Sequence, residues 1–429
     1  MAILFLFITF FICYKIIYCK NPANRLYWYI GSLLCLNDHV QVYGLLNASF
    51  IIEIAAILSI YREGKIRLYT KTFPLLLPLC LLFISHIIVG VVDNRLPISQ
   101  GFFRGVFSFS TSYLMLYTGY ILAFRVPYKT IVRTIVFFFV IIGIYTLMEF
   151  LTGSNPYYNM IETMYGKENN IWTVMDGQIT ERGQRCMGTQ SNPIYYGLLL
   201  STIGLFIVSN VFKDQKNKVL LLLLLAISLI ATKSRTPIVT FAIMYLIFLL
   251  PTSSLGSTIR VLFLSSLFVL LLGHFIPIFD TLINSLFEFA STGDSELQGS
   301  SSELRFQQLA TSYLYFLNSP IWGNGYYYFS ENIFSGRNDS YGGLAGMEGY
   351  IFELLIEQGA VQIILIILFW IQCYRCFFKY RALNKNISYV GIAMSTGFLF
   401  FIIATGANGA WLYSMPFIGM LLNKSQNNN

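Results

Sequence analysis

The sequence predicts an all-α, polytopic membrane protein with about twelve transmembrane helices and one large, partly helical outer loop. Hydrophobic residues make up 56% of its 429 residues and charged residues 11%, whereas about a quarter of the residues in soluble domains are charged. Many segments approach the roughly 18 apolar residues needed to cross a bilayer. Lys and Arg gather in short clusters between these segments, which is typical of cytoplasmic loops.

The N-terminal region contains two clear apolar segments, 2–19 and 43–60. The first has no basic stretch before it and no small-residue cleavage site after it, so we expect a retained span and not a removed signal peptide. Segment 27–36 is short. It is either interfacial, with its aromatic residues in the membrane belt, or an additional span that would reverse the N-terminus. The first cytoplasmic loop is marked by Arg62, Lys65, Arg67 and Lys71.

The charge of the later loops then alternates consistently. The expected spans are 73–92, 102–124, 131–151, 193–212, 219–232, 237–250, 261–276, 350–373, 389–404 and 411–422. By the positive-inside rule, loops 152–191 and 275–350 fall on the outer side. We therefore divide the chain into N-terminal helices (1–274), a large outer loop (275–350), and C-terminal helices with a short cytoplasmic tail (351–429).

The large loop contains one helix signal. The run Ser300-Ser301-Ser302-Glu303 has the spacing of a capping box. Apolar residues follow at positions 304, 309, 313 and 317, and Asn318-Ser319-Pro320 is a stop signal. We therefore expect an amphipathic helix here. The stretch 322–329 is rich in Gly, Asn and aromatic residues, which favours an ordered lid over a linker.

Several functions are not supported by the composition or by local motifs. The net charge of +8 is spread over loop clusters, so it does not indicate a nucleic-acid partner. The three His residues do not approach the cysteines or carboxylates at ligand spacing, so no metal site is expected. The sequence has no P-loop, Rossmann glycine pattern or nucleophile elbow. We expect no cofactor.

Arginines on the predicted outer side are the first candidate site residues. They are Arg182, Arg185, Arg235 and Arg305. Guanidinium groups bind phosphate oxygens in bidentate fashion and stay charged, so a converging set would hold a pyrophosphate. Alternatively, each arginine extends to lipid headgroups or pairs with an acidic neighbour. For Arg185 and Arg235, which break the positive-inside pattern close to the membrane, the functional interpretation is favoured.

Glu348 is the candidate general base, because a positioned carboxylate can accept the proton of an attacking sugar hydroxyl. Alternatively, it is a first-turn charge that complements the helix dipole. Glu353 and Glu357 lie on one face of the following helix, and we expect Glu357 to be a structural hydrogen-bond partner. The aromatic residues of 322–329 either stack on sugar rings or belong to the interfacial belt.

Together these pieces resemble the O-antigen polymerase and ligase superfamily, whose polytopic members move lipid-pyrophosphate-linked glycans on the periplasmic face. The matching pieces, in the family's order and spacing over about 182–361, are Arg185-Cys186-Met187-Gly188 leading to Asn192-Pro193 and Tyr196-Gly197, Ser234-Arg235, Arg305 ahead of Ser319-Pro320-Ile321-Trp322-Gly323-Asn324-Gly325, and Glu348 to Glu357-Gln358-Gly359.

The resemblance implies a metal-independent glycosyltransferase of the bacterial inner membrane, with its active site facing the periplasm. Its substrate would be an undecaprenyl-pyrophosphate-linked oligosaccharide, and its other partners would be membrane lipids and a chain-length regulator protein. By the same resemblance, Glu348, Arg235 and Arg185 are catalytic. The implied substrate-binding residues are Arg182, Arg305, Asn192, Trp322 and Tyr326.

Ligases of this superfamily typically carry a histidine where this chain has Glu348, so the resemblance favours a repeat-unit polymerase. The nearest alternative is an O-antigen ligase that uses lipid A core as acceptor. A transporter or flippase of lipid-linked glycans should show internal repeats and charges near the bilayer midplane. Here charges gather at helix ends, with Glu53, His86 and Arg104 as the main exceptions. The motifs of peptidoglycan-type polymerases are not found.

Overall fold

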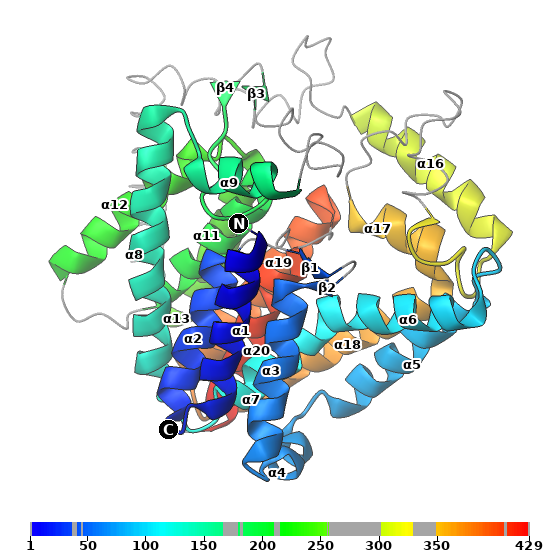
Figure 1. Cartoon of the computed structure of the whole chain (residues 1–429), viewed down its shortest axis with the longest axis horizontal. Helices are drawn as coiled ribbons and strands as arrows, with labels where there is room; N and C mark the ends of the chain where they lie inside the picture. Colours follow the sequence, from blue (N-terminus) through cyan, green and yellow to red (C-terminus); the bar gives the residue numbers. More distant parts are fainter. Residues whose placement is uncertain are drawn as a thin grey trace.

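The computed structural model describes residues 2–36, 41–43, 46–165, 179–180, 183–209, 215–254, 256, 302–328, 349–406 and 410–427. In these ranges the regular structure is helical apart from two short antiparallel hairpins (Figure 1). These pair β1 (Gln41–Tyr43) with β2 (Leu46–Asn47), and β3 (Ile179–Thr180) with β4 (Gly183–Gln184). The predicted all-α class is confirmed in this coarse sense.

The described residues form a series of helical elements. In chain order they are α1 (Ala2–Tyr18), α2 (Pro22–Cys35), α3 (Ala48–Arg62), α4 (Ile66–Thr72), α5 (Leu76–Val92), α6 (Ile98–Phe109), the π-helical η1 (Ser110–Leu114), α7 (Met115–Leu122), α8 (Tyr128–Thr152), α9 (Pro156–Tyr165), α11 (Pro193–Val208), α12 (Gln215–Ala231), α13 (Arg235–Thr252), α16 (Ser302–Asn318), α17 (Tyr350–Glu353), the π-helical η4 (Leu354–Gln358), α18 (Gly359–Tyr380), α19 (Lys385–Thr405), the 3₁₀-helical η5 (Ala410–Tyr413) and α20 (Met415–Gln426).

Four of the described helices are long and apolar enough to cross a membrane. They are Tyr128–Thr152, Arg235–Thr252, Tyr350–Tyr380 and Lys385–Thr405, and shorter apolar helices cover Leu4–Tyr18, Leu76–Val92 and Pro193–Val208. This supports a multi-pass membrane protein, but the predicted count of about twelve spans stays a prediction. The expected span 261–276 lies outside the described residues.

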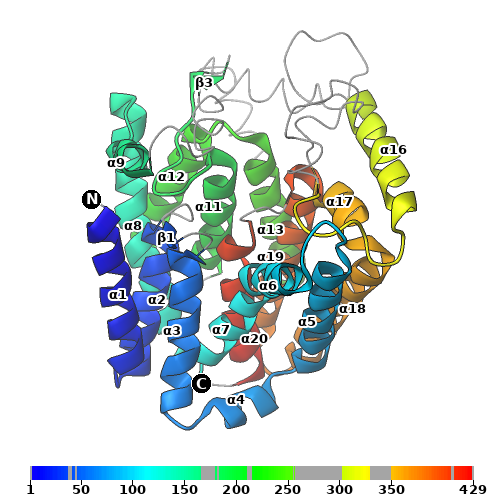
Figure 2. The same ribbon diagram turned by 45° about the vertical axis from the view of Figure 1, so that its right-hand side comes forward.

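The molecule has two distinct ends. Helices α9 and α16 and the β3–β4 hairpin lie at one end, which we call the loop end, while α4 and the C-terminus lie at the opposite end, which we call the α4 end (Figures 1 and 2). The sequence predicts an outer loop end and a cytoplasmic α4 end. Helix α16 stops at Asn318, as the predicted stop signal requires, and exposes the apolar side chains of Phe306, Leu314 and Leu317.

The first three helices stand side by side, and α2 runs antiparallel to its neighbours (Figure 2). The Arg62 guanidinium donates to the carbonyl of Ile17 at 3.4 Å, so α1 and α3 end together. Arg25, near the start of α2, donates to the Cys19 carbonyl at 2.9 Å. Segment 27–36 therefore belongs to a helix packed against α1 and α3, and the N-terminus lies toward the loop end (Figure 1). The choice between an additional span and an interfacial position stays a prediction.

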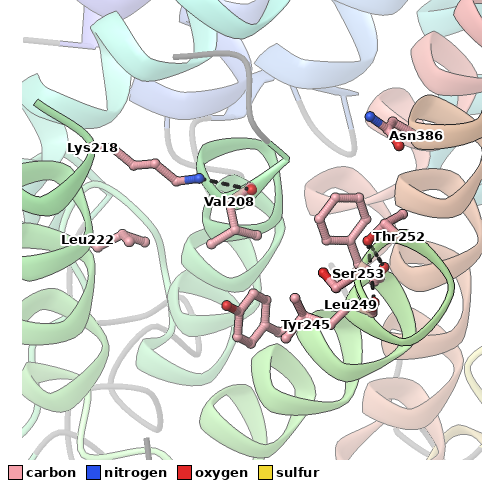
Figure 3. A pocket seen from close by; sticks show the side chains of 9 residues that line it. Val208, Lys218, Leu222, Tyr245, Leu249, Thr252, Ser253 and Asn386 are labelled. Carbon is pink, nitrogen blue, oxygen red and sulfur yellow. Dashed lines mark hydrogen bonds between the residues drawn. The ribbon is translucent and has the colours of Figure 1, made fainter. Parts of the chain in front are cut away.

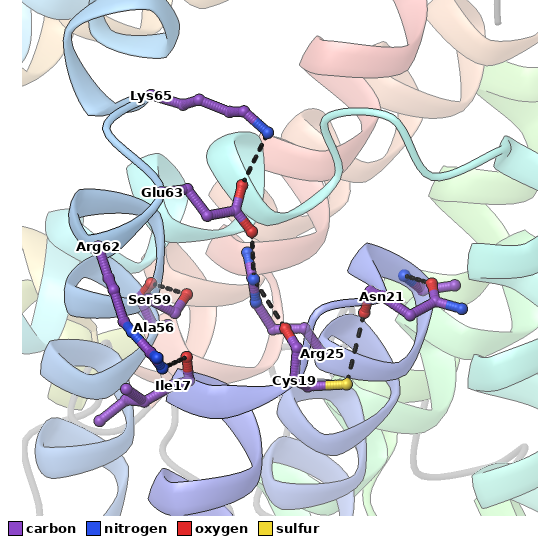
Figure 4. A network of polar contacts seen from close by, with 10 residues as sticks. Ile17, Cys19, Asn21, Arg25, Ala56, Ser59, Arg62, Glu63 and Lys65 are labelled. Carbon is purple, nitrogen blue, oxygen red and sulfur yellow. Dashed lines mark hydrogen bonds and ion pairs between the residues drawn. The ribbon is translucent and has the colours of Figure 1, made fainter.

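Arg25 also joins this corner to the connection that follows α3 (Figure 4). Its guanidinium forms an ion pair with Glu63, and Lys65 contacts the other carboxylate oxygen at 3.2 Å. Partial burial alone would raise the pKa of Glu63, but the hydrogen bond and positive charge of Arg25, together with Lys65, lower it below its ordinary value. Glu63 therefore remains ionised and can compensate the buried charge of Arg25.

The expected span 102–124 corresponds to a helical stretch in which α6 and α7 are separated by the π-helical turn η1. At this point side-chain hydroxyl groups compete with backbone amides for the carbonyl groups of the helix. The Ser110 hydroxyl donates to the Val106 carbonyl at 2.7 Å, and the Thr111 hydroxyl donates to the Phe107 carbonyl at 3.0 Å. Such side-chain bonds and π-turns are recognised causes of helix distortion.

Candidate functional site

The segment from Arg185 to the start of α11 forms an ordered turn at the loop end. The Cys186 amide donates to the Ala231 carbonyl at 2.9 Å and so joins this turn to the end of α12. The Arg185 side chain continues the same contact: its Nε donates to the Thr232 carbonyl at 3.2 Å and its Nη2 donates to the Ser234 hydroxyl. Because Ser234 is the N-cap of α13 and directly precedes Arg235, the structure brings together the stretches that carry Arg185 and Arg235.

A buried carboxylate on α8 holds this turn in place. Glu149 is 1% exposed, and its two carboxylate oxygens accept hydrogen bonds from the amides of Met187 at 3.2 Å and Gly188 at 2.8 Å. The Asn155 side chain donates to the Gly188 carbonyl at 2.8 Å. A buried ionised group needs such partners, and charge-assisted hydrogen bonds are the strong ones. Glu149 therefore fixes the backbone two and three residues after Arg185.

The sequence analysis did not identify Glu149. The signal was present, because a carboxylate inside a strongly apolar segment is costly and marks a functional candidate. Its partners could not be identified from sequence, since they lie nearly forty positions later. The family resemblance covers Arg185 but not Glu149.

We expect Glu149→Leu to reduce transferase activity by displacing Arg185. The substitution leaves two buried amide donors without an acceptor, at about 1–3 kcal/mol each. Glu149→Gln can still accept at one oxygen and should be milder. Thermal stability of the purified protein and the length of the glycan ladder in cells would measure both effects. Equal ladders for wild type and Glu149→Leu would contradict this role.

Helices α13 and α19 pack antiparallel and carry Arg235 toward the second half of the site. Ser253, at the end of α13, and Asn386, at the start of α19, line one shared cavity. Further along, a Cβ built on Gly397 of α19 would lie 2.3 Å from Cγ of Met244 on α13. These two contacts define the register of the pair.

This register places Arg235 level with the end of α19. Arg235 lies nine residues before the Met244 contact and Gly406 lies nine residues after the Gly397 contact, so each stretch rises by about 13.5 Å in the same direction. A Cβ built on Gly406 would in turn lie 3.8 Å from the amide nitrogen of Gly349. Gly349 directly follows Glu348. The start of α13 and the start of α17 therefore both lie level with the C-terminal end of α19.

The segment 319–328, which we call the clasp loop, connects α16 to the helices below it. The Asn324 side chain donates to the Tyr315 carbonyl of α16 at 3.0 Å and to the Ile356 carbonyl of η4 at 2.7 Å. The Gly325 amide donates to the Glu357 carbonyl at 3.0 Å. The Gly- and Asn-rich composition thus allows close contact between backbone segments. The expected structural role of the Glu357 side chain stays a prediction.

Two arginines from the α5–α6 hairpin complete the clasp loop. Arg95 donates to the Tyr326 carbonyl at 3.1 Å and Arg104 donates to it at 3.3 Å. The Arg95 guanidinium lies over the Tyr328 ring at 4.8 Å from the centroid, and Arg104 lies over the Tyr327 ring at 5.3 Å. Arg104, one of the exceptional charges in the sequence, is therefore a structural partner of the clasp loop.

The Tyr326 side chain points into the protein. It is 3% exposed, and its ring is stacked on His86 with centroids 5.8 Å apart. Gln362 of α18 contacts Nδ1 of this histidine at 2.9 Å and also contacts the Ser85 hydroxyl. In this position Tyr326 packs against protein instead of offering a face to a sugar. Trp322 remains partly exposed.

The other expected site residues are placed as follows. Asn192 accepts a hydrogen bond from the Ile194 amide at 2.7 Å, so it is the N-cap of α11 and its contact here is structural. Arg305 belongs to the first turns of α16, but its side chain lies outside the described part of the structure. Arg182 and Glu348 lie outside the described residues. Within the described ranges, no three metal-ligating side chains gather at one point.

A substitution at Gly325 tests how tightly the clasp loop packs. Its φ is +94°, and a Cβ added there would lie 2.3 Å from the Asp93 carboxylate, so we expect Gly325→Ala to destabilise the protein by about 1–3 kcal/mol or more. Gly64→Ala is the matched control, because Gly64 has a φ of +67° and a Cβ there would meet nothing within 4 Å. Thermal unfolding of the purified variants would show the difference. Equal stability would contradict the tight packing of the clasp loop on Asp93.

One comparison with known protein families found a match. Residues 220–370, or 151 of 429 residues, match the sequence model of a family described as O-antigen ligase (Wzy_C). This confirms the resemblance to the O-antigen polymerase and ligase superfamily. The matched stretch runs from α12 to α18 and contains Arg235, Arg305, Glu348 and the clasp loop. No curated protein matches the chain.

The superfamily match supports an O-antigen ligase or polymerase type of function, a glycosyltransferase-like activity and a lipid-linked glycan substrate. Arg185 and Glu149 lie before the matched stretch. Arg185 nevertheless donates to Thr232 and Ser234 beside the start of α13, and Glu149 accepts hydrogen bonds from the amides of Met187 and Gly188. Both therefore lie in the same structural unit as Arg235.

Proposed function

We propose that the protein is a repeat-unit polymerase of O-antigen or a related surface polysaccharide. It joins undecaprenyl-pyrophosphate-linked oligosaccharides on the periplasmic face of the bacterial inner membrane, with about twelve spans and a chain-length regulator as partner. The observation that carries this proposal is the hydrogen bond from Arg185 to Ser234, which brings Arg185 beside Arg235 at the level of the residue following Glu348.

Two guanidinium groups carried on adjoining stretches would suit the pyrophosphate of the donor. They bind phosphate oxygens in fixed geometry and stay charged, whereas a lysine offers a single point charge. Negative charge builds up on the leaving pyrophosphate as the glycosidic bond breaks, and preorganised cations stabilise that charge best where water is excluded. In this proposal Arg182 and Arg305 add further phosphate contacts, and the partly exposed Trp322 contacts sugar.

The reaction is a displacement at the anomeric carbon. A terminal sugar hydroxyl of the incoming lipid-linked unit attacks the anomeric carbon of the growing glycan, and Glu348 accepts the hydroxyl proton. A new glycosidic bond forms, the bond between the anomeric carbon and the phosphate oxygen breaks, and undecaprenyl pyrophosphate leaves. The guanidinium groups supply the positive charge, so no step of the scheme requires a metal ion.

A ligase is the second candidate, and the description of the matching family favours it. It would use the same donor site but transfer the glycan to lipid A core. The glutamate at position 348, in place of the histidine typical of ligases in the superfamily, supports the polymerase instead. The two functions share the arginine site, so the acceptor decides between them.

A gel of surface glycan from cells lacking this protein, with the lipid A core ligase intact, tests the proposal. Core carrying a single repeat unit, with the long ladder missing, is the expected result. Bare core with long lipid-linked polymer accumulating in the cell would favour the ligase. An unchanged ladder would contradict both functions and favour a transporter or flippase.

A further inference from the structure

A small cavity lies at the α4 end, between the ends of four helices. It has a volume of about 170 Å³ and is bounded by the end of α11, the start of α12, the end of α13 and the start of α19 (Figure 3). This position is opposite to the turn that joins Arg185 to Ser234, because α12 and α13 run between the two. The cavity is therefore separate from the proposed transferase site.

Among the described residues, the lining of the cavity combines one cation with neutral polar groups. Lys218 donates from Nζ to the Val208 carbonyl in the last turn of α11, at 3.2 Å. Thr252, Ser253 and Asn386 contribute polar atoms, and the other described lining residues are neutral or apolar. None of the described lining residues is acidic. The cavity thus presents a positive charge and hydrogen-bonding groups to whatever enters it.

The surroundings of the cavity are apolar on the side of α12. Val219, Leu220 and Leu223 of α12 are exposed, as expected for side chains that face lipid chains. They lie on the neighbouring side of the helix from Lys218 and Leu222, which line the cavity. A ligand with its anionic head in the cavity and its apolar chains on that neighbouring side would meet a matching group with each part. The volume corresponds to roughly five or six water molecules, at roughly 30 Å³ each. That suits a phosphate with part of a glycerol and is too small for an oligosaccharide repeat unit.

We propose that this cavity binds the phosphate of an anionic phospholipid. Lys218 pairs with the phosphate, the Ser253 hydroxyl and the Asn386 side-chain amide donate to its remaining oxygens, and the acyl chains lie along α12. Basic pockets between transmembrane helices on the cytoplasmic side bind such headgroups in other membrane proteins, and the predicted topology places the α4 end on that side. This inference does not depend on the polymerase proposal, because the two sites share no residue.

The test is a lipid titration of the purified full-length protein by native mass spectrometry. Phosphatidylglycerol, phosphatidylcholine and inorganic phosphate are the three probes. Lys218→Gln removes the cation of the cavity. Lys216→Gln is the matched control, because Lys216 carries the same charge on the same helix but is exposed and does not line the cavity.

We expect phosphatidylglycerol to bind more tightly than phosphatidylcholine to the wild type and to Lys216→Gln. For Lys218→Gln the affinity for phosphatidylglycerol should fall about fivefold or more, since one lysine near an anionic surface contributes about that factor. Lys218→Arg should retain binding. If Lys218→Gln does not fold, Ser253→Leu provides the second variant, because it fills part of the cavity without changing any charge, and it should also weaken binding.

Three outcomes would overturn the inference. Equal affinity for both phospholipids in the wild type would show that the phosphate charge is not recognised. Equal losses for Lys216→Gln and Lys218→Gln would indicate a general surface charge effect. Competition by inorganic phosphate at the concentration of the lipid would indicate a site for a soluble anion instead of a lipid.

Discussion

Replacing Arg185 or Arg235 by alanine should abolish long surface glycan while the protein stays inserted and abundant. Each variant removes a guanidinium group from the proposed pyrophosphate site. Removing one preorganised stabilising donor typically lowers kcat by about 10²- to 10³-fold. The ladder of surface glycan and the amount of protein in the membrane fraction are the two measurements. Arg381→Ala is a suitable control, because Arg381 is exposed at the opposite end of the molecule.

Lysine should rescue position 185 poorly. The Arg185 side chain donates from two different nitrogens, Nε to the Thr232 carbonyl and Nη2 to the Ser234 hydroxyl. A lysine has one nitrogen and cannot reproduce this fork. Full activity of Arg185→Lys would mean that only the charge matters. Loss of the protein from the membrane in the alanine variants would instead point to a structural role for these arginines.

Replacing Glu348 by glutamine should lower transfer by about 10²- to 10⁴-fold, the usual contribution of general acid–base catalysis. Glutamine keeps the size of the side chain but cannot accept the proton of the sugar hydroxyl. The rate of transfer with purified protein and the ladder in cells would measure the loss. Glu353→Gln, five residues further along the chain, is the control and should retain activity.

The alternative role of Glu348 as a helix-terminal charge makes a different prediction. Loss of such a charge costs about 0.3–1 kcal/mol of stability and leaves chemistry unchanged. A Glu348→Gln variant with normal transfer and slightly lowered thermal stability would therefore contradict the general-base role. Loss of transfer with unchanged stability would support it.

Local sequence patterns predicted the elements whose signals lie within one segment. The helix end at Asn318 is one example, and the helix that begins at Arg235 and contains the expected span 237–250 is another. Each signal depends on a few neighbouring residues. The pairing of Arg185 with Ser234 could be suspected from the family order, but its hydrogen bonds could not. They form between residues 49 positions apart.

Three features could not be read from local patterns, each for a physical reason. Segment 27–36 was ambiguous because α2 has only 14 residues, too few to span by the length rule, and it is stabilised by packing and by Arg25. Glu149 acts through amides far along the chain. Asn192 and Tyr326 were expected to contact substrate because of their positions in the family pattern, whereas their observed contacts are a helix cap and a stack on His86.

The most direct test of the proposed function is an assay with purified protein in lipid vesicles and one defined undecaprenyl-pyrophosphate-linked repeat unit. The products would be separated by glycan length, with lipid A core added in a parallel reaction. We predict lipid-linked glycans of two or more repeat units, release of undecaprenyl pyrophosphate, and no product with Arg185→Ala. Transfer to lipid A core alone, with no lipid-linked dimer, would contradict the polymerase function.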